Sequence, residues 1–334
     1  MSFVRKKTAA SATKIIAFHV VAVAIIVAVI IVAAMDMSGT KQAVPDPTRD
    51  IPVELRLWQA SAPVALADAE ATGLAIADGK AYVVSADRLD VYDLTGAKLT
   101  SWPLDKPARR IAAGPDGRLF VNHDMSLSVI NPKTGQTLET WPTGIGDGEL
   151  ISVAVSGQNV YASDYPSRSV VVWDLQGNRL RTFDGKTMGG TGFKLPSRNF
   201  PLAVGPEGLL RAANPGELRV EAYGPDGQRK FTWGRAGEDV TGFCGCCNPV
   251  AMAIFPDGRV VTAEKALPTV KVFTDRQDGT LASVVAGPDA FGPHMPADVA
   301  IDPSGRVWVL VPGKQQIQIY QKQPQQESGD DVAE

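Results

Sequence analysis

Short alternating runs of apolar residues recur along most of the chain and predict β-strands. Six segments begin with an alanine between two apolar residues and continue into a turn that ends in glycine. A second strand, an alternating third strand and, in five of the six, a further glycine turn and a fourth strand follow. The alanine-centred runs are Leu74-Ala75-Ile76, Ile111-Ala112-Ala113, Val153-Ala154-Val155, Leu202-Ala203-Val204, Met252-Ala253-Ile254 and Val299-Ala300-Ile301.

This internal repeat predicts the fold class. Repeats of roughly 37 to 50 residues fit a sheet of four strands, which is the blade of a β-propeller. A solenoid is the alternative, but it would need polar caps at its ends, and none is visible. We therefore expect an all-β protein with a six-bladed β-propeller over residues 52–322.

The sixth segment stops after its third strand, and the chain supplies the missing strand from its other end. Leu55-Arg56-Leu57-Trp58 matches Leu99-Thr100-Ser101-Trp102, the fourth strand of the first repeat, position for position. The N-terminal strand is thus predicted to close the last blade. Such closure removes the exposed sheet edges of an open stack.

The repeat also carries a family resemblance. Its pattern, Ala-Ile-x-x-x-Gly-x-x-x-Val followed by Val-x-Val-Tyr-x-x-x-Gly, resembles that of six-bladed NHL-repeat propellers over about residues 52–322. Cys246-Cys247-Asn248-Pro249, with Glu264-Lys265 after it, looks like a signature of uncharacterised bacterial propellers of this type. The resemblance implies a fold and no particular activity, since propellers serve as hydrolases, lyases, binding modules and scaffolds.

The N-terminal part predicts a membrane anchor. Residues 15–34 are almost all apolar, and a helix of this length crosses about 30 Å of hydrocarbon. Arg5, Lys6, Lys7 and Lys14 precede the run, which places the N-terminus in the cytoplasm and the propeller on the extracytoplasmic, periplasmic or extracellular, side. The alternative is a signal peptide cleaved after Val32-Ala33-Ala34. The expected order is a cytoplasmic segment 1–14, a transmembrane helix 15–34 acting as a signal anchor, a linker 35–51, the propeller 52–322 and a disordered tail 323–334.

Charge narrows the choice of partners. The formal net charge is −3, so there is no overall basic field to hold the phosphates of a nucleic acid. The expected partners are instead the membrane, through the single helix, and a protein or small molecule bound by the propeller.

Blade topology predicts where that partner binds. Short glycine turns between strands 1 and 2 and between strands 3 and 4 share one face. The longer loops between strands 2 and 3, and between blades, share the other face and meet at the axis, where a funnel is a natural ligand site. The candidate ligand-binding residues on this face are Asn248, Glu264, Lys265, His123 and Asp164. Glu264 and Lys265 could equally form a simple surface ion pair.

All three cysteines fall within one loop on this face. Cys244 with Cys247, or Cys246 with Cys247, could form a disulfide in an oxidising compartment. Alternatively, Cys244, Cys246 and Cys247 could bind copper or zinc with His294 or Met295 as a further ligand, or provide a reactive thiol. His294 lies between prolines, a context that also suits an exposed turn residue.

Three functions follow from these features. The first is a membrane-anchored binding or scaffold module with its ligand or partner on the loop face. The second is a metal- or thiol-dependent enzyme, a hydrolase, lyase or oxidoreductase, that uses the cysteine loop. The third is a copper- or zinc-handling protein. The sequence does not discriminate among them.

Overall fold

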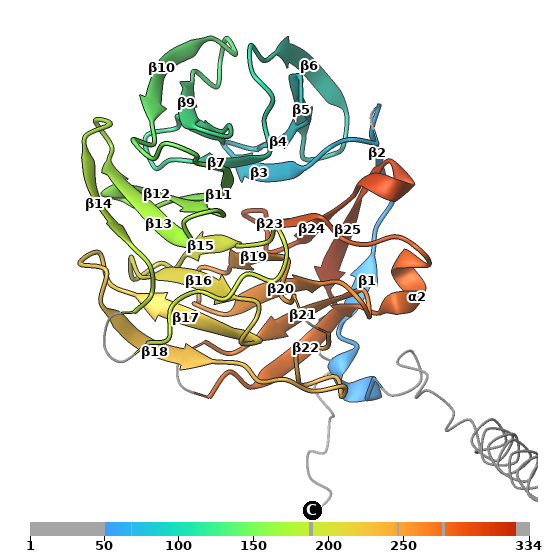
Figure 1. Ribbon diagram of the computed structural model, residues 1–334. Helices are drawn as coiled ribbons and strands as arrows, with labels where there is room; N and C mark the ends of the chain where they lie inside the picture. Colours follow the sequence, from blue (N-terminus) through green and yellow to red (C-terminus); the bar gives the residue numbers. More distant parts are fainter. Residues whose placement is uncertain (1–50, 68, 187–189, 246, 276–277, 325–334) are drawn as a thin grey trace, which may run out of the picture. The chain divides into compact units, whose positions relative to one another are not determined.

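The chain folds into a ring of six antiparallel sheets. The computed structural model describes residues 51–67, 69–186, 190–245, 247–275 and 278–324 (Figure 1). The predicted membrane helix 15–34 and nearly all of the linker and the tail lie outside these residues. Within the described ranges, no helix is both long enough and apolar enough to cross a bilayer.

The first five blades place their strands in chain order from the axis outward, and in the sixth the N-terminal strands lie outermost, beside β25. The first blade contains β3 (Gly73–Ala77), β4 (Lys80–Val84), β5 (Arg88–Asp93) and β6 (Lys98–Pro103), and the second β7 (Arg110–Ala113), β8 (Leu119–Asn122), β9 (Ser126–Ile130) and β10 (Thr137–Pro142). The third contains β11 (Leu150–Val155), β12 (Asn159–Asp164), β13 (Ser169–Asp174) and β14 (Arg179–Phe183), and the fourth β15 (Leu202–Val204), β16 (Leu210–Asn214), β17 (Arg219–Tyr223) and β18 (Arg229–Trp233). The fifth contains β19 (Ala251–Ile254), β20 (Val260–Glu264), β21 (Thr269–Phe273) and β22 (Leu281–Ala286). The sixth contains β23 (Asp298–Ile301), β24 (Val307–Val311), β25 (Gln316–Lys322) and the N-terminal strands β1 (Trp58–Ala60) and β2 (Val64–Ala65).

The axis of the ring is lined by the first strand of every blade, as the repeat predicts. An axial channel of about 290 Å³ runs between them, and the central alanine of each run is among the residues that line it. These alanines are Ala75, Ala112, Ala154, Ala203, Ala253 and Ala300. Six strands converge here, so small side chains at this position let the blades approach one another.

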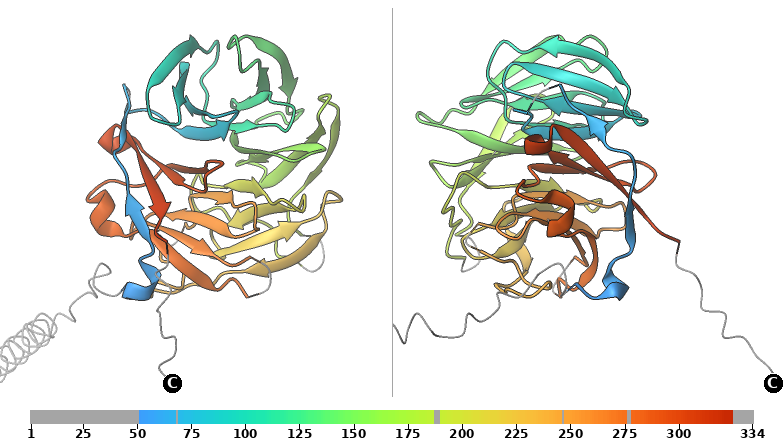
Figure 2. Two further views of the ribbon diagram at one scale, coloured as in Figure 1. Left: turned by 180° about the vertical axis from the view of Figure 1, so that it is seen from behind. Right: turned by 90° about the vertical axis from the view of Figure 1, so that its right-hand side faces the viewer.

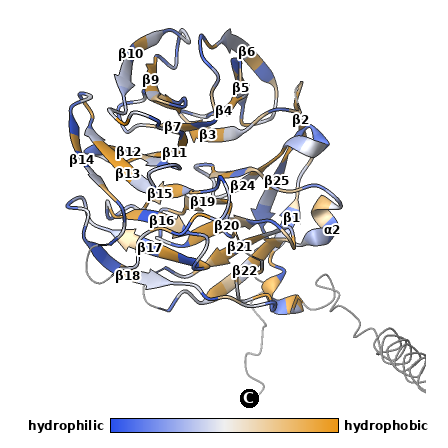
Figure 3. Cartoon of the chain, viewed as in Figure 1, coloured by the Kyte–Doolittle hydropathy of each residue, from blue (hydrophilic) through white to orange (hydrophobic). Residues whose placement is uncertain are grey.

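The hydrophobic core lies between the blades. Six clusters of buried residues each join one blade to the next, and together they complete the circle. The second and third strands are buried almost throughout, whereas the outer strand β14 is exposed over four of its five residues, and hydrophilic residues alternate with apolar ones along it (Figure 3). Burial of apolar area between blades is therefore the main stabilising contribution.

The second glycine of the repeat explains how neighbouring blades pack. Gly135, in the outer turn of the second blade, lies over the indole of Trp102 from the first blade, and an added Cβ would come within 2.2 Å of that ring. Gly177 lies over Trp141 in the same way, at 2.4 Å. Both glycines also have positive φ, 73° and 86°. The glycine of the outer turn in one blade and the large residue that ends the fourth strand of the preceding blade thus form a contact between blades.

The N-terminal strands close the ring, which confirms the predicted closure. Trp58 to Ala60 pair with Lys322 to Tyr320, and Val64 pairs with Ile317 (Figure 2). The predicted alignment is wrong, however. Gly96 packs against Val64 as Gly135 packs against Trp102, so Val64 and not Trp58 is the equivalent of Trp102.

The residues before Trp58 explain the difference in register. Val53–Leu55 form a 3-10 turn that begins after Pro52, so Leu55 is not part of a strand. Trp58 instead contacts the fifth blade, where its indole N–H donates to Ser283 Oγ at 3.0 Å and its ring stacks on Phe255. Trp58 is therefore an anchor between blades at the start of the closing strand.

Candidate functional site

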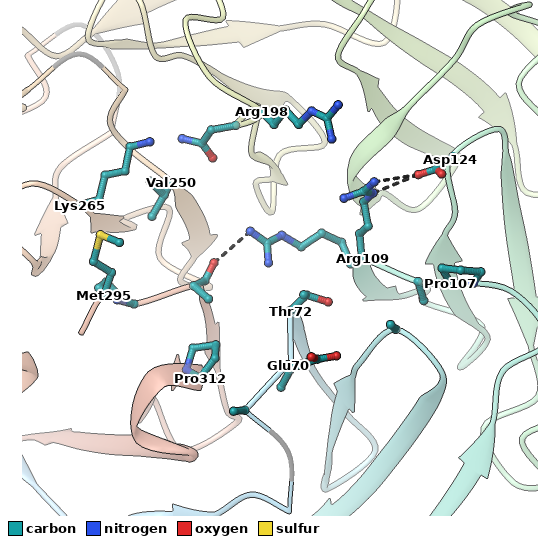
Figure 4. Close-up of a pocket in the computed structure, with 18 residues that line it drawn as sticks. Glu70, Thr72, Pro107, Arg109, Asp124, Arg198, Val250, Lys265, Met295 and Pro312 are labelled. Atoms are coloured by element: carbon teal, nitrogen blue, oxygen red, sulfur yellow. Dashed lines mark hydrogen bonds and ion pairs between the residues drawn. The ribbon is translucent and has the colours of Figure 1, made fainter. Parts of the chain in front are cut away.

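A cavity opens at the mouth of the axial channel, on the face of the long loops. It has a volume of about 650 Å³ and is lined by the segments that precede the first strands and by loops that follow second strands (Figure 4). Lys265 and Arg198 lie on one side of it in Figure 4, and Glu70, Thr72 and Pro312 lie on the opposite side. The funnel predicted at the axis is therefore present on the predicted face.

Cationic side chains are concentrated at the mouth although the chain is acidic. Four cationic side chains and two anionic ones line the cavity: Arg109, Arg110, Arg198 and Lys265, with Glu70 and Asp124. Two further carboxylates that do not line it, Glu149 and Asp298, pair with the arginines. Such a concentration of one sign of charge in a concave site attracts ligands of the opposite sign.

Two of the arginines share carboxylates on the rim. Arg109, just before β7, donates to Asp124 at 3.0 Å and also pairs with Glu149, just before β11, at 3.0 Å. Arg198 lies 3.3 Å from the same Glu149 oxygen and is 66% exposed. One carboxylate thus serves two guanidinium groups, and Arg198 keeps most of its donors in solvent.

Arg110 forms part of the floor of the mouth, where the cavity meets the channel. Its Nη2 donates to the carbonyl oxygen of Ala297 at 3.0 Å, and its Nη1 lies 3.9 Å from Asp298 Oδ2. Asp298 also accepts from the backbone N–H of Leu74 at 2.9 Å, so these contacts join blades six, one and two. Burial raises the pKa of Asp298, and Arg110 and the backbone donors partly offset that rise.

Lys265 is the predicted ligand-binding residue that lines the mouth. Its Nζ donates to Ser197 Oγ at 3.2 Å, and it forms no ion pair with a carboxylate in the described part of the chain. Its backbone is fixed by Asn248, whose Oδ1 accepts from the Lys265 N–H and whose Nδ2 donates to the Lys265 carbonyl oxygen, both at 2.8 Å. Asn248 is buried, so it supports the wall through the backbone and leaves the Lys265 ammonium facing the mouth.

The cysteine loop forms the outer support of this wall. Asn199 Nδ2 donates to the carbonyl oxygens of Cys247 and Pro249, at 2.9 and 2.8 Å, and the Asn248-Pro249 peptide bond is cis. Cys244 and Cys247, one of the predicted pairs, form no disulfide with each other in the described loop. Cys246 lies outside the described residues, so its pairing with Cys247 stays a prediction.

The predicted copper or zinc site is not assembled by the residues that can be described. Among them, no group of three or more His, Cys, Asp or Glu side chains is arranged to hold a metal ion. The His294 ring packs against the backbone of Gly313, where an added Cβ would lie 2.4 Å from Nδ1. Cys244 and Cys247 do not join His294 in a ligand set.

Glu264 does not face the mouth and does not pair with Lys265. It is buried at the end of β20, where Lys271 Nζ of β21 lies 3.0 Å from its Oε2 and also donates to the Gly242 carbonyl oxygen at 2.8 Å. Burial raises the pKa of Glu264 to about 7, although Lys271 and Thr262 act in the opposite direction. This ion pair fastens the loop that leads to the cysteines, and ligand binding by Glu264 stays a prediction.

His123 and Asp164 are buried beneath the rim. His123 hydrogen-bonds the Pro107 carbonyl oxygen and Ser128 Oγ, both at 2.8 Å, and burial lowers its pKa. Asp164 accepts from the backbone N–H groups of Glu149 and Ser167, at 2.6 and 2.9 Å. Neither side chain lines the mouth, so both position loops there.

The three arginines of the mouth are absent from the sequence-based candidates, although the sequence holds a signal for them. Arg109 and Arg110 directly precede the Ile111-Ala112-Ala113 run, and Arg198 lies shortly before Leu202-Ala203-Val204. Positions that enter a first strand come to the axis in every blade. A search of those positions for charge would have identified the arginines.

Comparison with known proteins supports the fold and leaves the activity open. No protein family model matches the chain, and no curated protein matches it in sequence. Among solved structures, a streptogramin B lyase is similar with a TM-score of 0.55 and 10% identity, over 79% of this chain and 98% of the lyase. Selenomethionine-substituted virginiamycin B lyase from Staphylococcus aureus is similar with a TM-score of 0.53 and 11% identity, over 79% of this chain and 99% of that one. At such identities the likeness shows that the chain shares the six-bladed propeller fold of these proteins.

Proposed function

We propose that this protein is a membrane-anchored binding module whose propeller holds a ligand at the axial mouth of its loop face. The observation that carries the proposal is the cavity of about 650 Å³ at that mouth, to which segments associated with five of the six blades contribute. A cavity of this volume falls in the range of small-molecule sites. Contacts between neighbouring blades hold its wall in place, so the site is largely formed before a ligand arrives.

The membrane anchor rests on the sequence. The apolar run 15–34 and the cations before it favour a single helix with the propeller outside the cytoplasm. The repeat pattern likewise supports assignment to the NHL-repeat group. The two lyases share only the fold with this chain, so lyase chemistry is not part of the proposal.

The topology has a direct test. A protease added to the outside of spheroplasts is expected to cut the linker 35–51 and to release the propeller, because folded propellers resist cleavage better than linkers do. Release only after the membrane is permeabilised would contradict an extracytoplasmic propeller.

The ligand site is tested by obstructing the mouth. Met295 lines the cavity and is 52% exposed, whereas Met125 is 50% exposed on another loop of the same face and does not line it. Met295→Trp is therefore expected to block the mouth, and Met125→Trp serves as the matched control. The full chain in detergent is screened by thermal shift against neutral, cationic and anionic small molecules.

Compounds that bind the mouth are expected to stabilise the unsubstituted protein and Met125→Trp, and not Met295→Trp. At a hundredfold excess over Kd the stabilisation is about 2.7 kcal/mol. Compounds that stabilise Met295→Trp as fully as the unsubstituted protein bind elsewhere and would refute the proposed site, as would the absence of any stabilising compound.

A further inference from the structure

We infer that the ligand of this mouth is a compact polyanion, a small molecule with two or more carboxylate or phosphate groups, held by Lys265, Arg198 and Arg110. The inference rests on the proposed function and adds the chemical class of the ligand. It follows from where the cations come from, from the lack of a close carboxylate partner for Lys265 and Arg110, and from their place around one cavity.

The cations come from three separate parts of the ring. Arg110 begins β7 in the second blade, Arg198 precedes the fourth blade, and Lys265 follows β20 in the fifth. Segments that are distant in sequence thus direct positive charge to one cavity. Bringing like charges together is unfavourable unless counter-ions or a ligand offset the repulsion.

The described carboxylates offset it only in part. Glu149 is shared between Arg109 and Arg198, at 3.0 and 3.3 Å, and Asp124 is used by Arg109. Lys265 has a hydroxyl partner, Ser197, and Arg110 has a carbonyl oxygen together with a carboxylate at 3.9 Å. Donors on Arg110, Arg198 and Lys265 therefore remain for acceptors brought by a ligand.

The geometry favours several anionic groups over one. Arg110 lies where the mouth narrows to the channel, whereas Arg198 and Lys265 lie on the rim, and Arg198 is 66% exposed. A single small anion on the floor would leave the rim cations in water. A molecule carrying charges at both levels pairs with all three, and charge-assisted hydrogen bonds of this kind are the stronger ones.

The support of Lys265 gives the cysteine loop a part in the same site. Buried Asn248 fixes the Lys265 backbone with two hydrogen bonds of 2.8 Å, and Asn199, next to Arg198, donates to the carbonyl oxygens of Cys247 and Pro249. The Cys247-Asn248-Pro249 segment thus ties the two rim cations to each other. It acts as a positioning element for the polyanion site.

The test is isothermal titration calorimetry of the full chain in detergent, at pH 7.5 in phosphate-free buffer. The probes are pyrophosphate and citrate, with glucose as a neutral probe. Lys265→Met and Arg198→Gln remove one charge each at side chains that are not buried, so the fold is expected to persist. Lys186→Met is the matched control, because Lys186 is 71% exposed, pairs with Asp184 and does not line the mouth.

Pyrophosphate or citrate is expected to bind, and Lys265→Met and Arg198→Gln are each expected to weaken binding about tenfold or more, the effect of losing one charged hydrogen bond. Lys186→Met should leave the affinity unchanged, and raising NaCl should weaken binding. The tighter of the two probes identifies phosphate or carboxylate as the recognised group.

Two results would overturn the inference: neither anion binds, or the rim variants bind as tightly as the control. If only neutral compounds bind, and Met295→Trp blocks them, the proposed binding site stands and the polyanion assignment fails.

Discussion

The buried pair of Glu264 and Lys271 yields a prediction that depends on pH. Both side chains are almost fully buried, with 1% and 4% exposed, and they lie 3.0 Å apart. Lys271→Met removes the cation and leaves the carboxyl group of Glu264 in an apolar surrounding. Breaking a buried pair in this way costs about 3–5 kcal/mol when the remaining group is charged.

The sign of the pH dependence follows from the pKa of Glu264. Burial raises it to about 7 in the folded protein, above its ordinary value of 4.5. A carboxyl with a raised pKa contributes stability that is fully present below pH 4.5 and is lost as the pH rises through 7. Without Lys271 the pKa of Glu264 rises further, so the variant continues to lose stability above pH 7, where the unsubstituted protein has stopped doing so.

The magnitude follows from this linkage. At pH 5.5 the carboxyl is protonated in both proteins, and the cost of Lys271→Met is that of the lost hydrogen bonds, about 1–2 kcal/mol. Above pH 7 the cost grows by about 1.4 kcal/mol per pH unit, to about 4 kcal/mol at pH 9. Urea unfolding of the full chain in detergent at pH 5.5, 7 and 9 measures the loss of unfolding free energy caused by Lys271→Met.

Two further variants control the experiment. Lys230→Met breaks the exposed pair with Asp226, whose side chains are 45% and 55% exposed, and should cost less than about 0.5 kcal/mol at every pH. Adding Glu264→Gln to Lys271→Met should remove the pH dependence. A cost of Lys271→Met that stays constant from pH 7 to pH 9 would show that Lys271 does not control the ionisation of Glu264.

Three other predictions concern packing and the cysteine loop. Gly135→Ala should lower the free energy of unfolding by about 2–4 kcal/mol, because the added Cβ meets Trp102 and φ is 73°, whereas Gly157→Ala, with open space around the added Cβ, should change it by less than about 0.5 kcal/mol. Equal urea midpoints for the two variants would contradict this. Trp58→Ala should cost about 3 kcal/mol by removing the contacts with Phe255 and Ser283, whereas exposed Gln59→Ala should cost little; similar unfolding curves would show that Trp58 is not an anchor. Under reducing conditions iodoacetamide should modify half-buried Cys244 faster than buried Cys247, as measured by peptide mass mapping, and the reverse order would contradict the described loop.

Much of the fold could be predicted because each repeat meets the same steric requirements. Little space is available at the axis and between blades, which favours alanine in the first strand and glycine in the outer turn, and both residues are visible in the sequence. The closing strand was harder. Trp58 resembles Trp102 locally, but its partners, Phe255 and Ser283, are some two hundred residues away in sequence.

The site could be located from the sequence, and only part of its composition could be predicted. Asn248 was found because it stands beside the cysteines, and Lys265 because it follows a second strand on the loop face. Lys265 lines the mouth, and buried Asn248 supports its backbone. Glu264 was expected beside Lys265 on the surface, but successive residues of a strand point to opposite sides, and its carboxylate pairs with Lys271 across the sheet. Which side chain of such a pair is buried depends on the neighbouring blade, and a local sequence motif contains no information about that blade.

Hydrogen–deuterium exchange of the full chain with and without pyrophosphate shows whether the loop-face mouth holds the ligand. We expect slower exchange in the segments around Arg110, Arg198 and Lys265, with no change in the turns of the opposite face around Gly117 and Gly258. Protection confined to the opposite face, or no protection at saturating pyrophosphate, would contradict binding at the mouth.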